Sequence, residues 1–465
     1  MMPNAIAQLA LLLWPALAAV LYARLSALTA TFITIVGGYL FLPVKVEFDL
    51  PLLPPLDQES IPVICAAIGC LVARGTGFIG IPVRGLERII VIVLLLSPVA
   101  TVMTNGEPYF DGEIFIRGLA IKDSLTAIAE TYLMLLPFVL GLALVKTDED
   151  LIKVFRLLVF FGLAYTPLVL YEARMSPQLH TMVYGFFPHS FAQQVRFGGF
   201  RPVVFVGHGL LLALFFTVPF LASAVLSRAR QRITALPNVL VTLYLALILV
   251  VCKSVAAWLI GFIGFCSIML MPQFLTRLLI RLICVTVIAY PLLCIMDLFP
   301  HQEFVEFAAL FGEGRAQSLD FRFYHEERLL EHAREKILLG WGAWGRNRLS
   351  DSVTDGFWII QLGCYGLVMF AGLFGLMSCS VFRALGVAGK SSGNDRRALY
   401  TGAALVAALM MMNQLPNSSL YSWLWFLFGC IGGVSYNRVW VVGHRERQVP
   451  GTAPAGCSQQ GALQL

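Results

Sequence analysis

The sequence predicts an all-α fold, a polytopic transmembrane helical bundle of about 12–13 spans. Hydrophobic residues make up 58% of the 465 residues and charged residues only 13%, about half the charged fraction of a soluble domain. Apolar stretches of roughly 17–25 residues, long enough to cross a bilayer, recur along most of the chain. Their centres are expected near residues 13, 35, 67, 96, 135, 161, 215, 245, 263, 287, 370, 405 and 427.

The charges of the connecting segments predict how these helices are oriented. Every second segment carries clustered Arg and Lys, from residues 74–88 to the last basic cluster at 438–447. The segments between them are acidic or neutral, as at 47–59 and 107–113. Because basic loops stay in the cytoplasm, we expect the N-terminus outside and the C-terminus inside. The net charge of +6 follows this topology and predicts no nucleic-acid partner.

Two outer segments are long and rich in cations, and they set the expected organisation of the chain. Residues 1–300 form a transmembrane bundle with an outer, arginine-bearing loop at 172–201. Residues 301–354 form a large outer segment, and residues 355–440 form the C-terminal transmembrane helices. Residues 448–465 are rich in Gly, Ala, Gln and Ser and are expected to be disordered.

The ten cysteines fall mostly inside the expected membrane helices, and no CxxC pair or other paired spacing links them. Neither a disulfide scaffold nor a zinc site is therefore supported, and we expect no metal and no cofactor. Buried cysteines of this kind act as small packing residues.

Residues 318–339 contain no Pro or Gly and are expected to form one amphipathic helix in the second outer segment. At 100° per residue, one side of this helix carries four basic residues: Arg322, His325, His332 and Lys336. The other side carries three acidic residues: Glu327, Glu331 and Glu335. Glu326 and Arg334 break this division. Such a helix suits a membrane surface, with its basic side toward an anionic head group. The alternative is a structural lid with solvated charges.

Further arginines in the outer segments are candidates for binding phosphate, since the guanidinium grips phosphate oxygens with two hydrogen bonds. Arg196 and Arg201 flank a flexible Gly198-Gly199 pair in the first segment, and Arg315 precedes the amphipathic helix in the second. The alternative is that these side chains extend to lipid phosphates at the membrane surface.

Asp355 opens the membrane helix that follows the second outer segment. An Asp in this position caps a helix N-terminus. A carboxylate at a membrane-edge cleft that faces arginines can also serve as a general base. The two roles are compatible, and both are kept open.

The second outer segment resembles that of the O-antigen ligase and polysaccharide polymerase superfamily of bacterial inner-membrane proteins. The resemblance rests on Arg322 within the amphipathic helix, the turn LLGWGAWG at 338–345, DGFW at 355–358 and QLGCYGL at 361–367. The RFGGFRP segment at 196–202 matches the arginine-bearing outer loop that members carry in their first half. One departure is clear: where ligases of the family have a His near the acceptor, this chain has Asp355 followed by Gly356.

The resemblance implies a metal-independent glycosyltransferase on the periplasmic side of the bacterial inner membrane. Its substrate would be a glycan on undecaprenyl diphosphate, and its acceptor a second glycan or a lipid. The residues implied for the lipid diphosphate are Arg196, Arg201, Arg315 and Arg322. Asp355 or His325 would be the base, and His332 and Lys336 would lie on the substrate-facing side of the helix. Because the ligase His is absent, polymerisation is favoured over ligation. Membrane lipid and other polysaccharide-assembly proteins are the remaining expected partners.

Two other classes of protein remain open at this point. A transporter or flippase for lipid-linked glycans would carry cations within its membrane helices and show symmetrical halves, whereas this sequence places its unusual cations in two outer segments. A scaffold in a polysaccharide-assembly complex would need no catalytic base.

Overall fold

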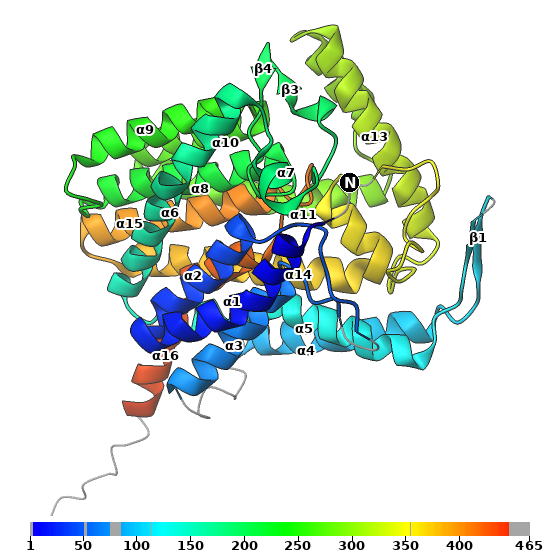
Figure 1. The fold of residues 1–465 in the computed structure, drawn as a ribbon, viewed down its shortest axis with the longest axis horizontal. Helices are drawn as coiled ribbons and strands as arrows, with labels where there is room; N and C mark the ends of the chain where they lie inside the picture. The colour runs from blue at the N-terminus through cyan, green and yellow to red at the C-terminus, as the bar shows by residue number, and fades with distance from the viewer. Residues whose placement is uncertain (1–2, 51–53, 75–84, 113, 354, 446–465) are drawn as a thin grey trace, which may run out of the picture.

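The computed structural model describes residues 3–50, 54–74, 85–112, 114–353 and 355–445 and shows a helical bundle (Figure 1). Each of the expected membrane stretches corresponds to one helix. These helices are α1 (Ala5–Arg24), α2 (Ala27–Phe41), α3 (Ser60–Arg74), α4 (Leu86–Met103), α5 (Ile121–Leu144), α6 (Asp148–Met175), α8 (Gly209–Arg228), α9 (Asn238–Val251), α10 (Val255–Met269), α11 (Gln273–Ile295), α14 (Phe357–Lys390), α15 (Asn394–Met412) and α16 (Ser422–Arg445). The predicted disordered tail, 448–465, lies outside the described residues.

The lengths and hydropathy of these helices confirm an all-α membrane protein. In the described part of the chain, seven helices are long and apolar enough to cross a membrane: α1, α4, α5, α6, α8, α11 and α14. Five further apolar helices are shorter, including α2, α3, α9 and α10. Six of the seven long helices contain an internal proline, and the seventh, α14, is interrupted at Gly366. Membrane helices tolerate such residues because neighbouring elements satisfy the freed backbone groups.

The remaining elements lie in the loops. They are α7 (Leu179–Tyr184), η2 (Ala192–Gln194), α12 (His301–Ala309), the longer α13 (Glu313–Arg334), and two antiparallel hairpins. The first hairpin pairs β1 (Tyr109–Asp111) with β2 (Ile114–Ile116), and the second pairs β3 (Val195–Arg196) with β4 (Gly199–Phe200). In Figure 1 the β1 hairpin projects from the bundle at the right, and α13 lies at the upper right.

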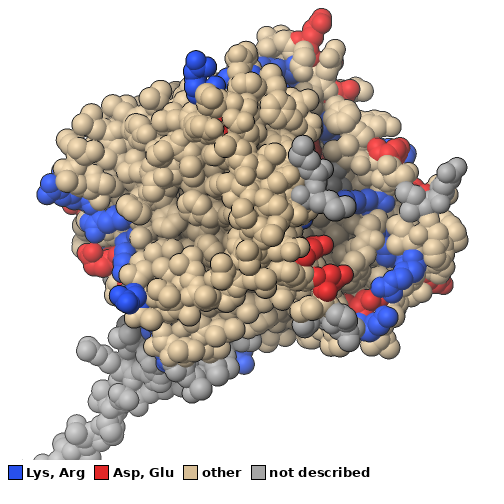
Figure 2. Space-filling model, in the orientation of Figure 1, with Lys and Arg blue, Asp and Glu red and all other residues tan. Residues whose placement is uncertain are grey.

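The charge pattern divides the loops into an outer and an inner set, and three hydrogen bonds each join two loops of the same set. In the first set, Arg346 donates to the Arg117 carbonyl (3.0 Å) and the Ser422 amide donates to Glu59 (2.8 Å). In the second set, Arg396 donates to Asp148 (3.1 Å). Figure 2 shows charged side chains at the left end and along the right and upper margins, with a broad, nearly uncharged surface between them. An uncharged band between two charged ends is the surface expected of a chain that crosses a bilayer.

The beginning of the chain lies against the outer loop 172–201. The amide of Asn4 donates to the Tyr184 carbonyl (3.0 Å), and its side-chain amide donates to the Val183 carbonyl (2.9 Å). The side-chain oxygen of Asn4 also caps α1 by accepting from the Ala7 amide (3.0 Å). The N-terminus and this loop therefore lie at the same end of the bundle, as the charge pattern predicts.

Helices α5 and α16 approach closely because glycines line their contact. A Cβ atom added at Gly141 would lie 2.4 Å from the Phe426 carbonyl oxygen, and one added at Gly429 would lie 2.1 Å from the Phe138 oxygen. Small residues allow membrane helices to pack backbone against backbone, where van der Waals contact drives association. The close packing of α5 against α16 therefore depends on these glycines.

Helix α14 is interrupted at Gly366, where φ is 71° and ψ is −169°. Residues 337–342 lie against the interruption and supply partners for its backbone. The amides of Trp341 and Gly342 donate to the carbonyls of Gly363 and Cys364 (both 2.8 Å), and the Leu367 amide donates to the Ile337 carbonyl (2.8 Å). We call this pairing of residues 337–342 with residues 363–368 the backbone clasp. It assigns a structural role to the glycines of the LLGWG and QLGCYGL motifs.

The clasp also corrects the bounds of the amphipathic helix. The helix expected over 318–339 is α13, which begins earlier, at Glu313, and ends at Arg334. Residues 335–339 form turns, and the amides of Trp341 and Gly342 then bond to α14 instead of continuing the helix. Helix α4 holds the same segment, since Thr101 Oγ1 donates to the Leu339 carbonyl (2.5 Å) and Asn105 Nδ2 donates to the Gly340 carbonyl (3.0 Å).

Replacing Gly366 tests the clasp. A Cβ atom at Gly366 would lie 2.2 Å from the Leu338 carbonyl oxygen, and its backbone conformation is one that only glycine adopts readily, at a cost of about 1–3 kcal/mol for other residues. We expect Gly366→Ala to lower the thermal stability of the detergent-solubilised protein. Gly386→Ala, in the same helix with open space around it, should leave stability unchanged. Equal melting temperatures for the two variants would contradict the clasp.

Candidate functional site

A pocket of about 490 Å³ opens between α11, α13, the start of α14 and the segment that follows α15. Its walls are mostly apolar and include Val285, Ala289, Leu293, Phe299 and Phe304. Its charged and imidazole groups come from α13 and the residue beside α14, and they are Arg322, His325, Glu326 and Asp355, while Thr286 and Tyr290 add hydroxyl groups from α11. An apolar cavity with a few convergent polar groups is the usual form of a ligand site.

Arg322 and Asp355 form the charged rim of this pocket. Arg322 Nε lies 3.7 Å from Asp355 Oδ2, and Arg322 Nη1 donates to the Pro416 carbonyl (3.2 Å). Both side chains remain open to solvent, at 41% and 44% exposed, so their ion pair contributes little to stability. Asp355 does not cap α14, because the cap position is Gly356 and no side chain bonds there. A cation and a carboxylate are therefore available side by side at the rim.

His325 lies deeper in the pocket wall and is 8% exposed. Its ring packs edge-on against Phe321, with centroids 4.3 Å apart. Its Nδ1 atom is enclosed and has no hydrogen-bond partner among the described residues. A buried imidazole nitrogen without a partner is unusual, because buried polar atoms are normally hydrogen-bonded.

Glu326 is a pocket residue that the sequence pattern did not single out as functional. The Tyr290 hydroxyl donates to one carboxylate oxygen, and Trp358 Nε1 donates to the other (3.2 Å). Burial raises the pKa of Glu326 to about 7, because a low-dielectric environment penalises the carboxylate. The sequence feature that could have identified Glu326 is its position, because it breaks the division of charge around the helix.

Arg334, the other residue that breaks the division, attaches α13 to the end of α11. Its Nη2 and Nε atoms donate to the carbonyls of Cys294 (2.7 Å) and Ile295 (3.2 Å), and Nη1 pairs with Glu327 (2.8 Å). These contacts satisfy carbonyls at a helix C-terminus, which otherwise lack partners. Both exceptions to the amphipathic pattern thus attach the helix to its neighbours.

His332 and Lys336 belong to a different cluster from the pocket. His332 stacks on Trp341 with centroids 4.4 Å apart, and its Nε2 bonds to the Arg346 carbonyl (2.8 Å). Lys336 donates to Asn105 Oδ1 (2.7 Å), lies 4.4 Å from the centre of the Trp341 ring, and has a pKa lowered by burial. Neither residue lines the pocket. The four basic residues expected on one side therefore divide into two pairs.

Arg196 and Arg201 form a third group, around the β3–β4 hairpin. The Gly198-Gly199 pair is not a flexible link, because Phe197 and Gly198 form the tight turn of the hairpin with φ values of 50° and 67°. Arg201 is 9% exposed and donates twice to the Lys253 carbonyl (3.2 and 3.0 Å). The ammonium of Lys253 donates to the Arg196 carbonyl (3.2 Å).

The three other candidate arginines do not line the pocket, which therefore brings together only part of the predicted site. Arg196 is exposed on the hairpin, Arg201 is engaged with Lys253, and Arg315 is exposed in the first turn of α13. Of the residues singled out from the sequence, the pocket unites Arg322, His325 and Asp355. Which residues line the pocket depends on which loops lie side by side. The sequence carries no simple signal for this pairing of loops.

No family model matches this chain, and no curated protein matches it. The functional argument therefore rests on the geometry and chemistry of the pocket.

Filling the apolar part of the pocket with a larger side chain tests whether the pocket binds an alkyl chain. We expect Ala289→Phe, on the α11 wall, to weaken binding of dodecyl phosphate to the solubilised protein, because the new ring occupies space that the alkyl chain needs. Leu282→Phe adds a ring to the same helix at an exposed position (54%) outside the pocket and should bind as the wild type does. Calorimetric titration checks both, and unchanged affinity in Ala289→Phe would count against a chain-binding pocket.

Proposed function

We propose that the protein is a membrane glycosyltransferase that polymerises or ligates glycans carried on undecaprenyl diphosphate. One observation carries the proposal: an apolar pocket at the end of the bundle has a cation, a carboxylate and an imidazole on its lining. A lipid-linked glycan has the matching parts, which are an apolar chain, an anionic diphosphate and a polar sugar. Apolar walls suit the chain, and Arg322 suits the diphosphate.

The reaction requires few protein groups. An acceptor hydroxyl attacks the anomeric carbon of the donor sugar, a new C–O bond forms, and the bond to the lipid diphosphate breaks, with its electron pair leaving on the diphosphate. A diphosphate is a good leaving group that needs stabilisation of negative charge, which a preorganised cation provides. Arg322 is the candidate for this role.

The acceptor hydroxyl must lose a proton as it attacks, and a base near the pocket would accept it. Asp355 lies beside Arg322 at the rim, and His325 has an enclosed nitrogen without a partner. Both remain candidates. Asp355 stands where ligases of the resembling superfamily have a His, and this difference favours polymerisation over ligation.

The proposal assigns the other cations to supporting roles. Arg201 is engaged with the Lys253 carbonyl, and His332 and Lys336 pack around Trp341. We place the reaction at the end of the bundle that carries α13, which the basic-loop rule makes the non-cytoplasmic end. The resemblance implies that this end faces the periplasm of a bacterial inner membrane.

The decisive experiment supplies undecaprenyl-diphosphate-linked oligosaccharide to the purified protein in lipid vesicles and follows the products by mass. Longer lipid-linked chains together with free undecaprenyl diphosphate would support a polymerase. Release of the carrier only when an acceptor lipid is added would support a ligase. Binding without turnover would contradict the proposal and favour transport or scaffolding.

Arg322→Ala tests the role of the cation in this assay. We expect the rate of transfer to fall about 10²–10³-fold, as on loss of one group that stabilises developing negative charge. Arg328→Ala is a matched control, because Arg328 lies on the same helix, is also 41% exposed and also pairs with an aspartate, Asp351 (3.3 Å), but does not line the pocket. Equal rates for the two variants would exclude Arg322 from the site.

Asp355→Asn and His325→Ala separate catalysis from binding. Loss of the general base should lower kcat by about 10²–10⁴-fold while leaving KM for the lipid-linked donor nearly unchanged, because the base acts on the acceptor. The base is the residue whose replacement shows this effect. If neither variant lowers kcat, acid–base catalysis from this pocket is ruled out.

A further inference from the structure

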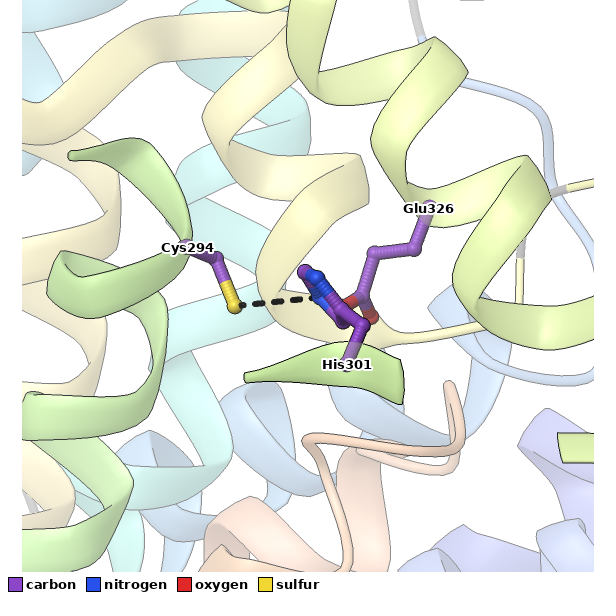
Figure 3. A group of neighbouring side chains, drawn as sticks. All are labelled: Cys294, His301 and Glu326. Carbon is purple, nitrogen blue, oxygen red and sulfur yellow. Dashed lines mark hydrogen bonds between the residues drawn. The ribbon is translucent and has the colours of Figure 1, made fainter. Parts of the chain in front are cut away.

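Three potential metal ligands converge behind the pocket from three different elements. Cys294 lies near the end of α11, His301 is the first residue of α12, and Glu326 is in the middle of α13. Figure 3 shows the three side chains pointing toward one another. Their ligand atoms all lie within 4.8 Å of each other, and Cys294 Sγ is 4.0 Å from His301 Nε2.

We propose that Cys294, His301 and Glu326 form a Zn²⁺ site that fixes α12 and α13 to the end of α11. Zinc binds thiolate at about 2.3 Å, imidazole at about 2.0–2.1 Å and carboxylate at about 2.0–2.2 Å in tetrahedral geometry. These bond lengths place neighbouring ligand atoms about 3.3–3.6 Å apart. The observed separations need to contract by about 1 Å, which side-chain rotation provides. A water molecule completes the four ligands.

The surroundings orient the ligands as metal sites require. Tyr290 and Trp358 each donate a hydrogen bond to Glu326, and a carboxylate retains further lone pairs for a metal. The ring of His301 is held between Phe299 and Phe323, with centroids 4.9 and 4.7 Å away. Outer partners of this kind fix the direction of a ligand and are a regular part of metal sites.

Charge and ligand type both favour zinc at this position. A thiolate and a carboxylate together balance a divalent cation, so the occupied site carries no net charge, and Cys294 is only 1% exposed. The thiol gives its proton to solvent when the metal binds. Sulfur and imidazole ligands suit Zn²⁺, whereas Mg²⁺ and Ca²⁺ prefer oxygen ligands. Six residues separate Cys294 from His301, and Glu326 lies further along the chain. A search for sequence motifs does not detect ligands with this spacing.

The site goes beyond the transfer reaction proposed above, which uses no metal. Cys294 and His301 do not line the pocket, whereas Glu326 does. A bound ion would thus hold the pocket wall from behind, and its presence is measurable without any substrate.

The test measures metal in the full-length protein purified in detergent. We expect about one Zn²⁺ per chain by mass spectrometry, and a near-ultraviolet thiolate-to-cobalt absorption band after exchange with Co²⁺. Cys294→Ala and His301→Ala should each reduce the zinc content at least tenfold and abolish the cobalt band. Cys284→Ala makes the same change at another buried cysteine of α11 and should retain both signals.

Two outcomes would overturn the proposal. One is wild-type protein that takes up neither zinc nor cobalt with the thiolate band. The other is equal zinc in Cys294→Ala and Cys284→Ala, which would indicate adventitious binding. The wild-type cobalt spectrum does not depend on the variants folding. Since no measurement here uses activity, failure of the metal site and failure of the proposed glycosyltransferase are distinguishable.

Discussion

Backbone hydrogen bonding across the interruption in α14 is the constraint on which the α13 end of the molecule depends. A broken membrane helix leaves amide and carbonyl groups without partners, and each costs several kcal/mol in hydrocarbon. Residues 337–342 supply those partners, and α4 holds the same segment through Thr101 and Asn105. The C-terminal end of α13 is therefore fixed to the bundle, and the helix is directed across the end of α11. The pocket is the space between them.

The pocket combines an apolar interior with a charged, solvent-exposed rim. Its apolar walls exclude water, and its rim keeps Arg322 and Asp355 nearly half exposed. A rim ion pair with high exposure is easily exchanged for contacts to a ligand, since solvent already weakens it. Deeper in the wall, His325 and Glu326 are shielded from solvent. A ligand that spans both environments would meet charge at one end and hydrocarbon at the other.

Most of the fold was predictable from the sequence because hydropathy is a property of contiguous residues. Every expected membrane stretch is a helix, and the amphipathic helix exists. Its end was misplaced because Trp341 and Gly342 pair with residues more than twenty positions further along the chain, which helix propensity does not register. The adjacency of Arg322 and Asp355 agrees with the expectation of a shared cleft, since Asp355 follows the segment that returns from α13 to the bundle.

The contacts of the remaining site residues could not be predicted from sequence patterns. Arg201 has the residue type of a phosphate binder, but its guanidinium binds the Lys253 carbonyl. Glu326 and Arg334 seemed to be exceptions to an amphipathic pattern, and both bond to neighbouring helices. A helical wheel distinguishes only two sides of a helix. Helix α13 contacts neighbours on several sides, so a division into a basic side and an acidic side could not predict all of its contacts.

The contact between Asn4 and the loop at 172–201 has a consequence for the order of biosynthesis. The two partners are separated by 179 positions in the chain, so at about 5–20 residues per second they are made roughly 10–40 seconds apart. During that interval the first helix has no final neighbour at its leading end, and several membrane helices must be inserted before one is available. This contact can therefore form only after the chain through Tyr184 has been made, so it closes later than the packing of the first helices against one another.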